Sequence, residues 1–166
     1  MIQLKLSNTT QVCLLDDEDL SLVLSHNTKW HLADSGVYCR SALILDGRGR
    51  RIKIAMHRLL TNMLAINDLR DVDHINGNRL DNRRSNLRVC PHQLNLHNTG
   101  KRTDKIFTSN YKGVSWHRKA GKWQVGLCVR GRRINGGLFT EEVSAAKMSN
   151  KLMLEHLGEY ARLNEV

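Results

Sequence analysis

The sequence lacks several features that define common classes of protein. It has no run of about 18 apolar residues, which excludes a membrane-spanning helix, and residues 1–20 lack the charged-then-apolar pattern of a signal peptide. Low-complexity sequence is scarce and 40% of the residues are apolar, which excludes a disordered tail protein. No heptad seam is visible either. We therefore expect an intracellular, soluble and monomeric protein.

Closely spaced cysteine pairs are also missing. The four cysteines, Cys13, Cys39, Cys90 and Cys128, lie far apart and form no C-x-x-C pair. This spacing argues against a thiolate zinc site and, in a reducing compartment, against disulfides. We expect the four to be small buried apolar side chains.

Acidic residues are too few to balance the basic ones. There are 26 Lys and Arg against 16 Asp and Glu, a net charge of +10, which suggests a polyanionic partner, most often nucleic acid. Residues 1–100 hold 13 basic and 10 acidic side chains, while residues 101–140 hold 10 basic side chains and one acidic. The positive charge is thus a block in the second part of the chain.

Aromatic residues divide at the same place, since six of the eight follow residue 100. Two domains with different cores explain both divisions. The polar stretch between Asn98 and Lys105 is a natural connection. The predicted organisation is a first domain over residues 1–98, a linker over 99–108 and a second domain over 109–166.

In the first domain, the four acidic residues 16–19 suit the N-terminus of a short apolar helix, where we expect them to be solvated. Strand-like runs at 29–32 and 37–45 lead to the hairpin signal Asp46-Gly47 and a returning strand over 51–55. Alternation puts Ile52 and Ile54 on one face. The basic side chains of this hairpin form a ribbon that either contacts phosphates or is merely solvated: Arg48, Arg50, Arg51 and Lys53. His57 is expected to be a packed or capping histidine and not a ligand.

The densest group of polar residues lies between Asp71 and Asn98. Residues 72–75 and 87–90 are predicted strands, Asn76-Gly77 is a turn signal, and Pro91 suits the first position of a helix. Adjacent residues on a strand point to opposite faces, so one of Asp73 and His74 can bind a metal while the other addresses a water. A carboxylate with the amide of Asn95 would select a hard cation such as Mg²⁺ or Mn²⁺.

The pattern D-H-I-N-G-N-x-x-D-N-R-x-S-N-L-R followed by Q-x-N-x-x-N resembles the HNH, or ββα-metal, homing endonucleases of phages and mobile introns. The resemblance runs from about Gln3 to Asn98, with a ββα-metal core at about 71–98. It implies that His74 is the general base, that Asp73 and Asn95 bind the metal, and that the side-chain oxygen of Asn86 holds the histidine ring. The implied location is the cytoplasm of a bacterial host, with a phage genome as one source.

The second domain alternates cleanly between apolar and polar residues. Val114 and Trp116, four residues of the strand from Trp123 to Val129, and Ile134 with Leu138 are predicted to share one face, which a helix from about Glu141 to Leu157 covers. Gly158 is a natural C-cap. The expected fold class is α+β: a β-rich region leading into the ββα module, then a three-stranded antiparallel sheet packed on one helix. We expect Trp116 and Trp123 to be core residues.

The residues Tyr111-Lys112-Gly113-Val114, Gly121-Lys122-Trp123 and Arg133-Ile134 resemble the plant APETALA/ethylene-response-factor DNA-binding domain. The resemblance covers about Ser109 to Asn164 and implies a sheet that binds double-stranded DNA. It puts six residues on the DNA-facing sheet: Lys112, Ser115, His117, Gln124, Arg133 and Asn135. Four more are expected on phosphates: Arg118, Lys122, Arg130 and Arg132. Gly136 stands where the family has a larger apolar residue, which we expect to loosen the packing.

Together the patterns predict a site-specific, metal-dependent DNA endonuclease of homing type. One such site cuts one strand at a time, so a monomer is expected to nick, leaving 5′-phosphate and 3′-hydroxyl ends. Two alternatives stay open at this point. One is a sequence-specific DNA-binding regulator with an inactive nuclease module, and the other, weaker, is a basic RNA-binding protein.

Overall fold

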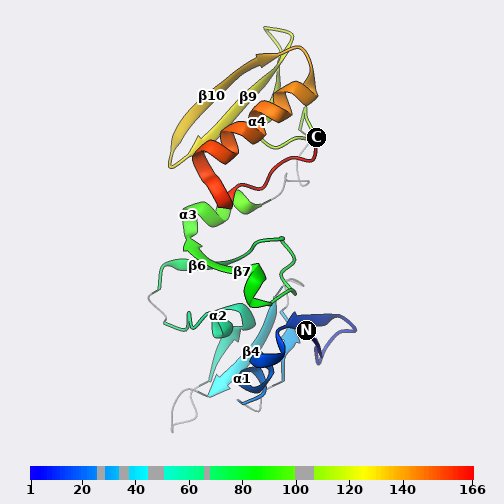
Figure 1. Ribbon diagram of the computed structural model, residues 1–166, viewed down its shortest axis with the longest axis vertical. Coiled ribbons are helices and arrows are strands. Elements are labelled where there is room, and N and C mark those ends of the chain that lie inside the picture. Colours follow the sequence, from blue (N-terminus) through cyan, green and yellow to red (C-terminus); the bar gives the residue numbers. More distant parts are fainter. Residues whose placement is uncertain (26–28, 34–37, 45–50, 66–67, 100–106) are drawn as a thin grey trace. The chain divides into compact units, whose positions relative to one another are not determined.

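The computed structural model describes residues 1–25, 29–33, 38–44, 51–65, 68–99 and 107–166 (Figure 1). The chain divides into two compact units, Met1–His92 and Gln93–Val166. Both mix strands and helices, so the predicted α+β class is confirmed. The predicted domain limits at residues 98 and 109 stay predictions. In the part of the chain that the structure describes, no helix is long and apolar enough to cross a membrane.

The first unit contains three small antiparallel sheets. They are a hairpin of β1 (Ile2–Lys5) and β2 (Val12–Leu15), a sheet in the order β3 (His31–Leu32), β4 (Cys39–Ile44), β5 (Arg51–Ala55), and a pair formed by β6 (Arg70–His74) and β7 (Leu87–Pro91). The predicted pairing of β4 with β5 is confirmed. The Asp46-Gly47 turn lies outside the described residues.

Short helical segments connect these sheets. They are η1 (Asp17–Asp19), α1 (Leu20–Leu24), α2 (Met56–Leu60) and η2 (Arg84–Asn86). The helix predicted after the acidic residues is α1, and it is only five residues long. A helix this short is stable only through tertiary contacts, and the buried Val23 supplies one.

One apolar core holds the first unit together. It contains Leu6, Cys13, Leu15, Val23, Trp30, Cys39, Ile54, Met56, Leu59 and Leu60. Ile52 packs against it together with Ile54, as the alternation predicts. Leu80 and Leu87 also pack against this core, so the segment between β6 and β7 is attached to it.

The second unit has the predicted three-stranded antiparallel sheet, formed by β8 (Val114–His117), β9 (Lys122–Val129) and β10 (Arg132–Phe139) in the order β10-β9-β8. The helix α4 (Glu142–Leu157) packs along one face of this sheet (Figure 1). Its remaining elements are α3 (His92–Asn95), η3 (Leu96–Asn98) and η4 (Gly158–Tyr160). Gly158 ends α4 with a φ of 54° and donates its N–H to the carbonyl of Leu154, the predicted C-cap.

Two expectations about the apolar face of this sheet are wrong. A β-bulge between Asn135 and Gly137 shifts the alternation by one residue, so Phe139 packs inward and Leu138 is 46% exposed. Trp116 lies at the edge of the sheet beside Trp123 and is 39% exposed, so it is not a core residue.

The packing around Gly136 is tight, contrary to the expectation of looseness. A Cβ at this position would lie 2.6 Å from Cγ1 of Val125 and 2.8 Å from Cδ1 of Leu152. The bulge brings the backbone close to the helix, and only glycine leaves room for both side chains.

The cysteines follow the expectation in part. All four are free thiols. Cys13, Cys39 and Cys90 are buried, but Cys128 is exposed. The reason is its place in β9 opposite Arg133, on the face of the sheet that α4 does not cover.

Candidate nuclease site

The C-terminal end of β6 carries the two residues expected to do the chemistry. Asp73 and His74 are both buried, with 5% and 4% exposure. In the antiparallel pair they lie opposite Arg88 and Leu87 of β7. Directly after His74 the chain turns, and the N–H of Gly77, which has a φ of 76°, donates to the carbonyl of His74 over 2.8 Å. The predicted turn is therefore present and fixes the end of β6.

Asp73 forms a buried ion pair across the two strands. Both Nε and Nη2 of Arg88 donate to Oδ2 of Asp73, over 3.0 and 2.7 Å. The Arg88 side chain is only 12% exposed. A guanidinium this close neutralises the carboxylate that is expected to bind a metal. Sequence reasoning missed Arg88, because pairing the predicted strands 72–75 and 87–90 end to end puts Val89 opposite Asp73, one residue away from the observed register.

Aromatic rings surround His74. The ring of His57 stands edge-on to that of His74 at 5.1 Å between centroids, and the ring of Tyr38 lies 5.2 Å from His57 and 6.2 Å from His74. His57 is buried, as expected of a packed histidine. Its position against the predicted base was not foreseen, because the two lie 17 residues apart on different elements.

Burial keeps both imidazoles neutral. It lowers the pKa of His57 to about 3, and the neighbouring His74 adds to the shift. Burial also lowers the pKa of His74, although the neighbouring side chain of Asn82 acts in the opposite direction. A neutral imidazole can accept a proton, so His74 is in the form that a general base requires at neutral pH.

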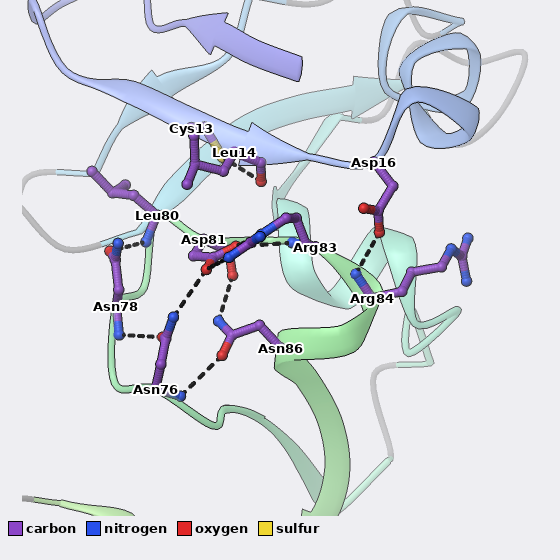
Figure 2. A network of polar contacts seen from close by, with 10 residues as sticks. All are labelled: Cys13, Leu14, Asp16, Asn76, Asn78, Leu80, Asp81, Arg83, Arg84 and Asn86. Carbon is purple, nitrogen blue, oxygen red and sulfur yellow. Dashed lines mark hydrogen bonds and ion pairs between the residues drawn. The ribbon is translucent and has the colours of Figure 1, made fainter. Parts of the chain in front are cut away.

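Asn86 ties together the segment between β6 and β7 (Figure 2). Its Oδ1 accepts the backbone N–H of Asn76 over 2.9 Å, and its Nδ2 donates to the carbonyl of Asp81 over 2.8 Å. The side chain of Asn76 in turn donates to Oδ2 of Asp81 over 2.9 Å. These bonds shape the loop that follows His74. The more specific expectation, that Asn86 holds the histidine ring itself, stays a prediction.

The same loop is fixed to the N-terminal hairpin. The N–H of Leu14 donates to the carbonyl of Leu80, and the N–H of Asn82 donates to the carbonyl of Leu14, each over 2.8 Å, so the loop pairs with β2 through a parallel bridge. The Asn82 side chain is buried and donates to Sγ of Cys13 over 2.9 Å. Asn82 was missed in the sequence because its partner lies 69 residues away.

The acidic residues of the N-terminal region form part of this attachment. Asp19 is 3% exposed, and both of its oxygens accept hydrogen bonds from Arg84 at 2.6 to 3.0 Å. Asp16 accepts the backbone N–H of Arg84 over 2.8 Å (Figure 2). The expectation that all four acids are solvated is therefore wrong, because two of them bind the start of η2.

Asn95, the second expected metal ligand, ends α3 and belongs to the second unit, whereas Asp73 belongs to the first. Asn95 is half-buried. The preceding Leu94 packs against the core of Leu127, Met153 and Leu157. Pro91 is the last residue of β7 and not the first of the helix, because it still pairs with Arg70. A metal site shared by Asp73 and Asn95 stays a prediction.

The basic residues predicted near the N-terminal hairpin are only partly described. Arg48 and Arg50 lie outside the described residues. Arg51 is described through its backbone alone, which pairs with Ile44 in the β4–β5 ladder. Lys53 is exposed on β5. The alternative between a solvated and a phosphate-contacting ribbon therefore stays open.

In the second unit, the register gathers most of the predicted DNA-facing residues on the side of the sheet away from α4. Cross-strand partners share a face, and the pairs are Ser115 with Gln124, His117 with Lys122, Arg133 with Cys128 and Asn135 with Gly126. Arg118, Arg130 and Arg132 are exposed at or beside the strand ends. No acidic residue lies between residues 107 and 139. We call this side the basic sheet face.

Lys112 has a different environment. Its side chain is half-buried, and its ammonium group donates to the carbonyls of His97 and Thr99. Burial lowers its pKa. These contacts hold the segment after η3, so we leave Lys112 out of the basic sheet face.

Comparison with known proteins bears on the first of these sites. A family model described as HNH endonuclease matches residues 68–97. Searches of the curated proteins and of the solved structures found no match. The matched segment contains β6, the loop, β7 and α3. It supports a nuclease of the HNH type, which acts on DNA and generally uses a divalent metal.

The residues present fit such a metal. Among the described residues, no group of three or more His, Cys, Asp or Glu side chains could hold an ion by itself. The carboxylate of Asp73 together with one amide oxygen would supply two oxygen ligands. This suits a hard cation, which keeps several waters and takes phosphate oxygens as further ligands. The guanidinium of Arg88 balances the charge of this carboxylate.

Proposed function

We propose that this chain is a site-specific DNA endonuclease of homing type that nicks its target and leaves 5′-phosphate and 3′-hydroxyl ends. The observation that carries the proposal is the buried pair Asp73 and His74 at the end of β6, within the segment that matches the HNH endonucleases. A carboxylate and a neutral imidazole side by side supply a cation ligand and a base on one rigid element.

In the proposed reaction, His74 accepts a proton from a water molecule through a ring nitrogen. The water oxygen then forms a bond to phosphorus while the bond from phosphorus to the 3′ oxygen breaks, and the leaving oxygen takes up a proton to become the 3′-hydroxyl. Burial against His57 keeps His74 neutral and restricts its ring. A divalent cation held by Asp73 and Asn95 would stabilise the negative charge on the leaving oxygen.

We further propose that the basic sheet face supplies most of the affinity for duplex DNA. A β-sheet can enter the major groove, and exposed arginines and lysines at its strand ends are suited to phosphates. If about six phosphates are contacted, log Kd rises with log salt concentration with a slope of about 5. A slope near zero, measured by fluorescence anisotropy, would contradict this assignment.

Cleavage of supercoiled plasmid carrying a candidate target tests the function. The proposal predicts relaxed circles in Mg²⁺ or Mn²⁺, none in chelator, and linear product only as a later, second event. Mapping the ends on both strands identifies the cleaved bond and the strand. Tight binding of the plasmid without metal-dependent breakage would contradict the proposal and favour a regulator.

A further inference from the structure

The segment from β6 to β7 carries five arginines, and four of them are neutralised by carboxylates. Arg70 pairs with Asp68, Arg83 with Asp81, Arg84 with Asp19 and Arg88 with Asp73. Arg79, in the loop after His74, is exposed, and none of the ion pairs among the described residues involves it. Its charge is therefore the one in this segment that the described structure leaves for an external anion.

Arg79 is nevertheless held in place. The Cζ atom of its guanidinium lies 4.9 Å from the centroid of the Tyr38 ring, a cation–π contact. The same ring lies 6.2 Å from that of His74. Arg79 and the proposed base thus contact a common aromatic side chain, and both belong to the first unit.

The backbone on each side of Arg79 is also fixed (Figure 2). The N–H of Asn78 donates to Oδ1 of Asn76 over 2.8 Å, and the N–H of Leu80 donates to Oδ1 of Asn78 over 3.1 Å. The carbonyl of Leu80 accepts the N–H of Leu14. Arg79 therefore extends from a loop that is already ordered before any ligand binds, which lowers the entropic cost of using it.

We propose that Arg79 binds a non-bridging oxygen of the phosphate that is cut, and that Tyr38 is the positioning residue that holds its guanidinium there. A guanidinium recognises two phosphate oxygens at once and stays charged at every pH that the reaction uses. Beside His74, it would oppose the negative charge that grows on phosphate as water attacks. The inference rests on the proposed nuclease function and adds a third group to its site.

Single-turnover cleavage of a short duplex carrying the mapped site tests Arg79. Arg79→Gln is expected to lower the rate at saturating DNA about 100-fold, with less than a threefold change in Kd measured in chelator. Arg79→Lys keeps the positive charge but lacks the planar guanidinium that can donate to two phosphate oxygens, and it should recover part of the rate. Lys5→Gln removes the same charge from an exposed position of β1 and should leave the rate unchanged.

The outcomes separate the two proposals. No cleavage by the wild-type protein overturns the nuclease function. Wild-type cleavage with an unchanged rate for Arg79→Gln overturns the role of Arg79 alone. A loss of affinity without a loss of rate also overturns it, because the arginine would then contact DNA away from the reacting phosphate. Arg79 is exposed, so we expect both variants to fold. Arg79→Lys also keeps the positive charge and therefore serves as the second variant if Arg79→Gln does not fold.

The role of Tyr38 is tested in the wild-type protein and in the Arg79→Gln protein. Tyr38→Leu removes the ring and is expected to lower the rate about threefold, whereas Tyr38→Phe keeps it and should behave as wild type. If Tyr38 acts through Arg79, Tyr38→Leu has no further effect in the Arg79→Gln protein. An equal effect in both backgrounds would show that the ring acts elsewhere and would overturn the positioning role.

Discussion

Asp73 and Arg88 neutralise each other across β6 and β7, at 6% and 12% side-chain exposure. Removal of one partner leaves a buried charge, which is strongly destabilising. We predict that Arg88→Met lowers the free energy of unfolding by about 3 kcal/mol in chelator. A cation beside Asp73 would replace the lost guanidinium, so Mg²⁺ should raise the melting temperature of this variant more than that of the wild type.

The matched control is Arg70→Met, on the same pair of strands. Arg70 also pairs with an aspartate, Asp68, but its side chain is 60% exposed, and exposed pairs contribute little. Thermal unfolding of both variants with and without Mg²⁺ makes the comparison. If the response of Arg88→Met to Mg²⁺ equals that of the wild type, Asp73 is not a cation ligand.

His57 makes stability depend on pH. Its pKa is about 6.5 when unfolded and about 3 in the folded protein, so the unfolded chain binds the proton first. The contribution of neutral His57 to the free energy of unfolding is therefore fully present above pH 6.5 and is lost as the pH falls toward 3. We predict a loss of about 2 kcal/mol between pH 7 and pH 5 from this residue, measured by urea unfolding. The same loss in His57→Gln would contradict it.

Single residues show where sequence reasoning ends. Asp73 and His74 were identified from a local motif, and the structure buries both. Asn82 and Asp19 were not recognised, because their partners Cys13 and Arg84 lie 69 and 65 residues away. No local pattern records a contact of that kind.

At the scale of elements, alternation and turn signals were sufficient to find the strands of the second unit and the pairing of β4 with β5. These signals gave the wrong face for residues after the β-bulge in β10, where the alternation of inward and outward side chains shifts by one residue. The bulge at Gly136 turned Leu138 outward and Phe139 inward, and nothing in the strand itself marks a bulge except a pair of glycines. The pairing of β2 with the loop at Asp81 had no signal either, since it depends on the tertiary fold.

The close approach at Gly136 leads to a prediction about β10. Gly136→Ala places a methyl group within 2.8 Å of Val125 and Leu152, and overpacking of this kind is destabilising. We expect a loss of about 2 kcal/mol, followed by tryptophan fluorescence in denaturant. Gly126→Ala is the control, because its Cβ would come no closer than 3.7 Å to any atom. Equal stability of the two variants would contradict the packing described for the bulge.

At the scale of the whole molecule, the net charge of +10 is divided between two tasks. Residues 1–100 are nearly balanced, and four of the five arginines near the proposed site are paired with acids. The excess lies in residues 101–140, much of it on the basic sheet face. On our account the end of β6 in the first unit carries the base of the cutting reaction, and the basic sheet face of the second unit holds the DNA.

The central claim is that His74 is the base of a nuclease. Its most direct test is the single-turnover rate of metal-dependent cleavage by His74→Ala at saturating duplex DNA, with Kd measured in parallel. The account predicts a rate lower by about 10²- to 10⁴-fold and a nearly unchanged Kd, because the basic sheet face is intact. A cleavage rate equal to that of the wild-type protein would contradict it.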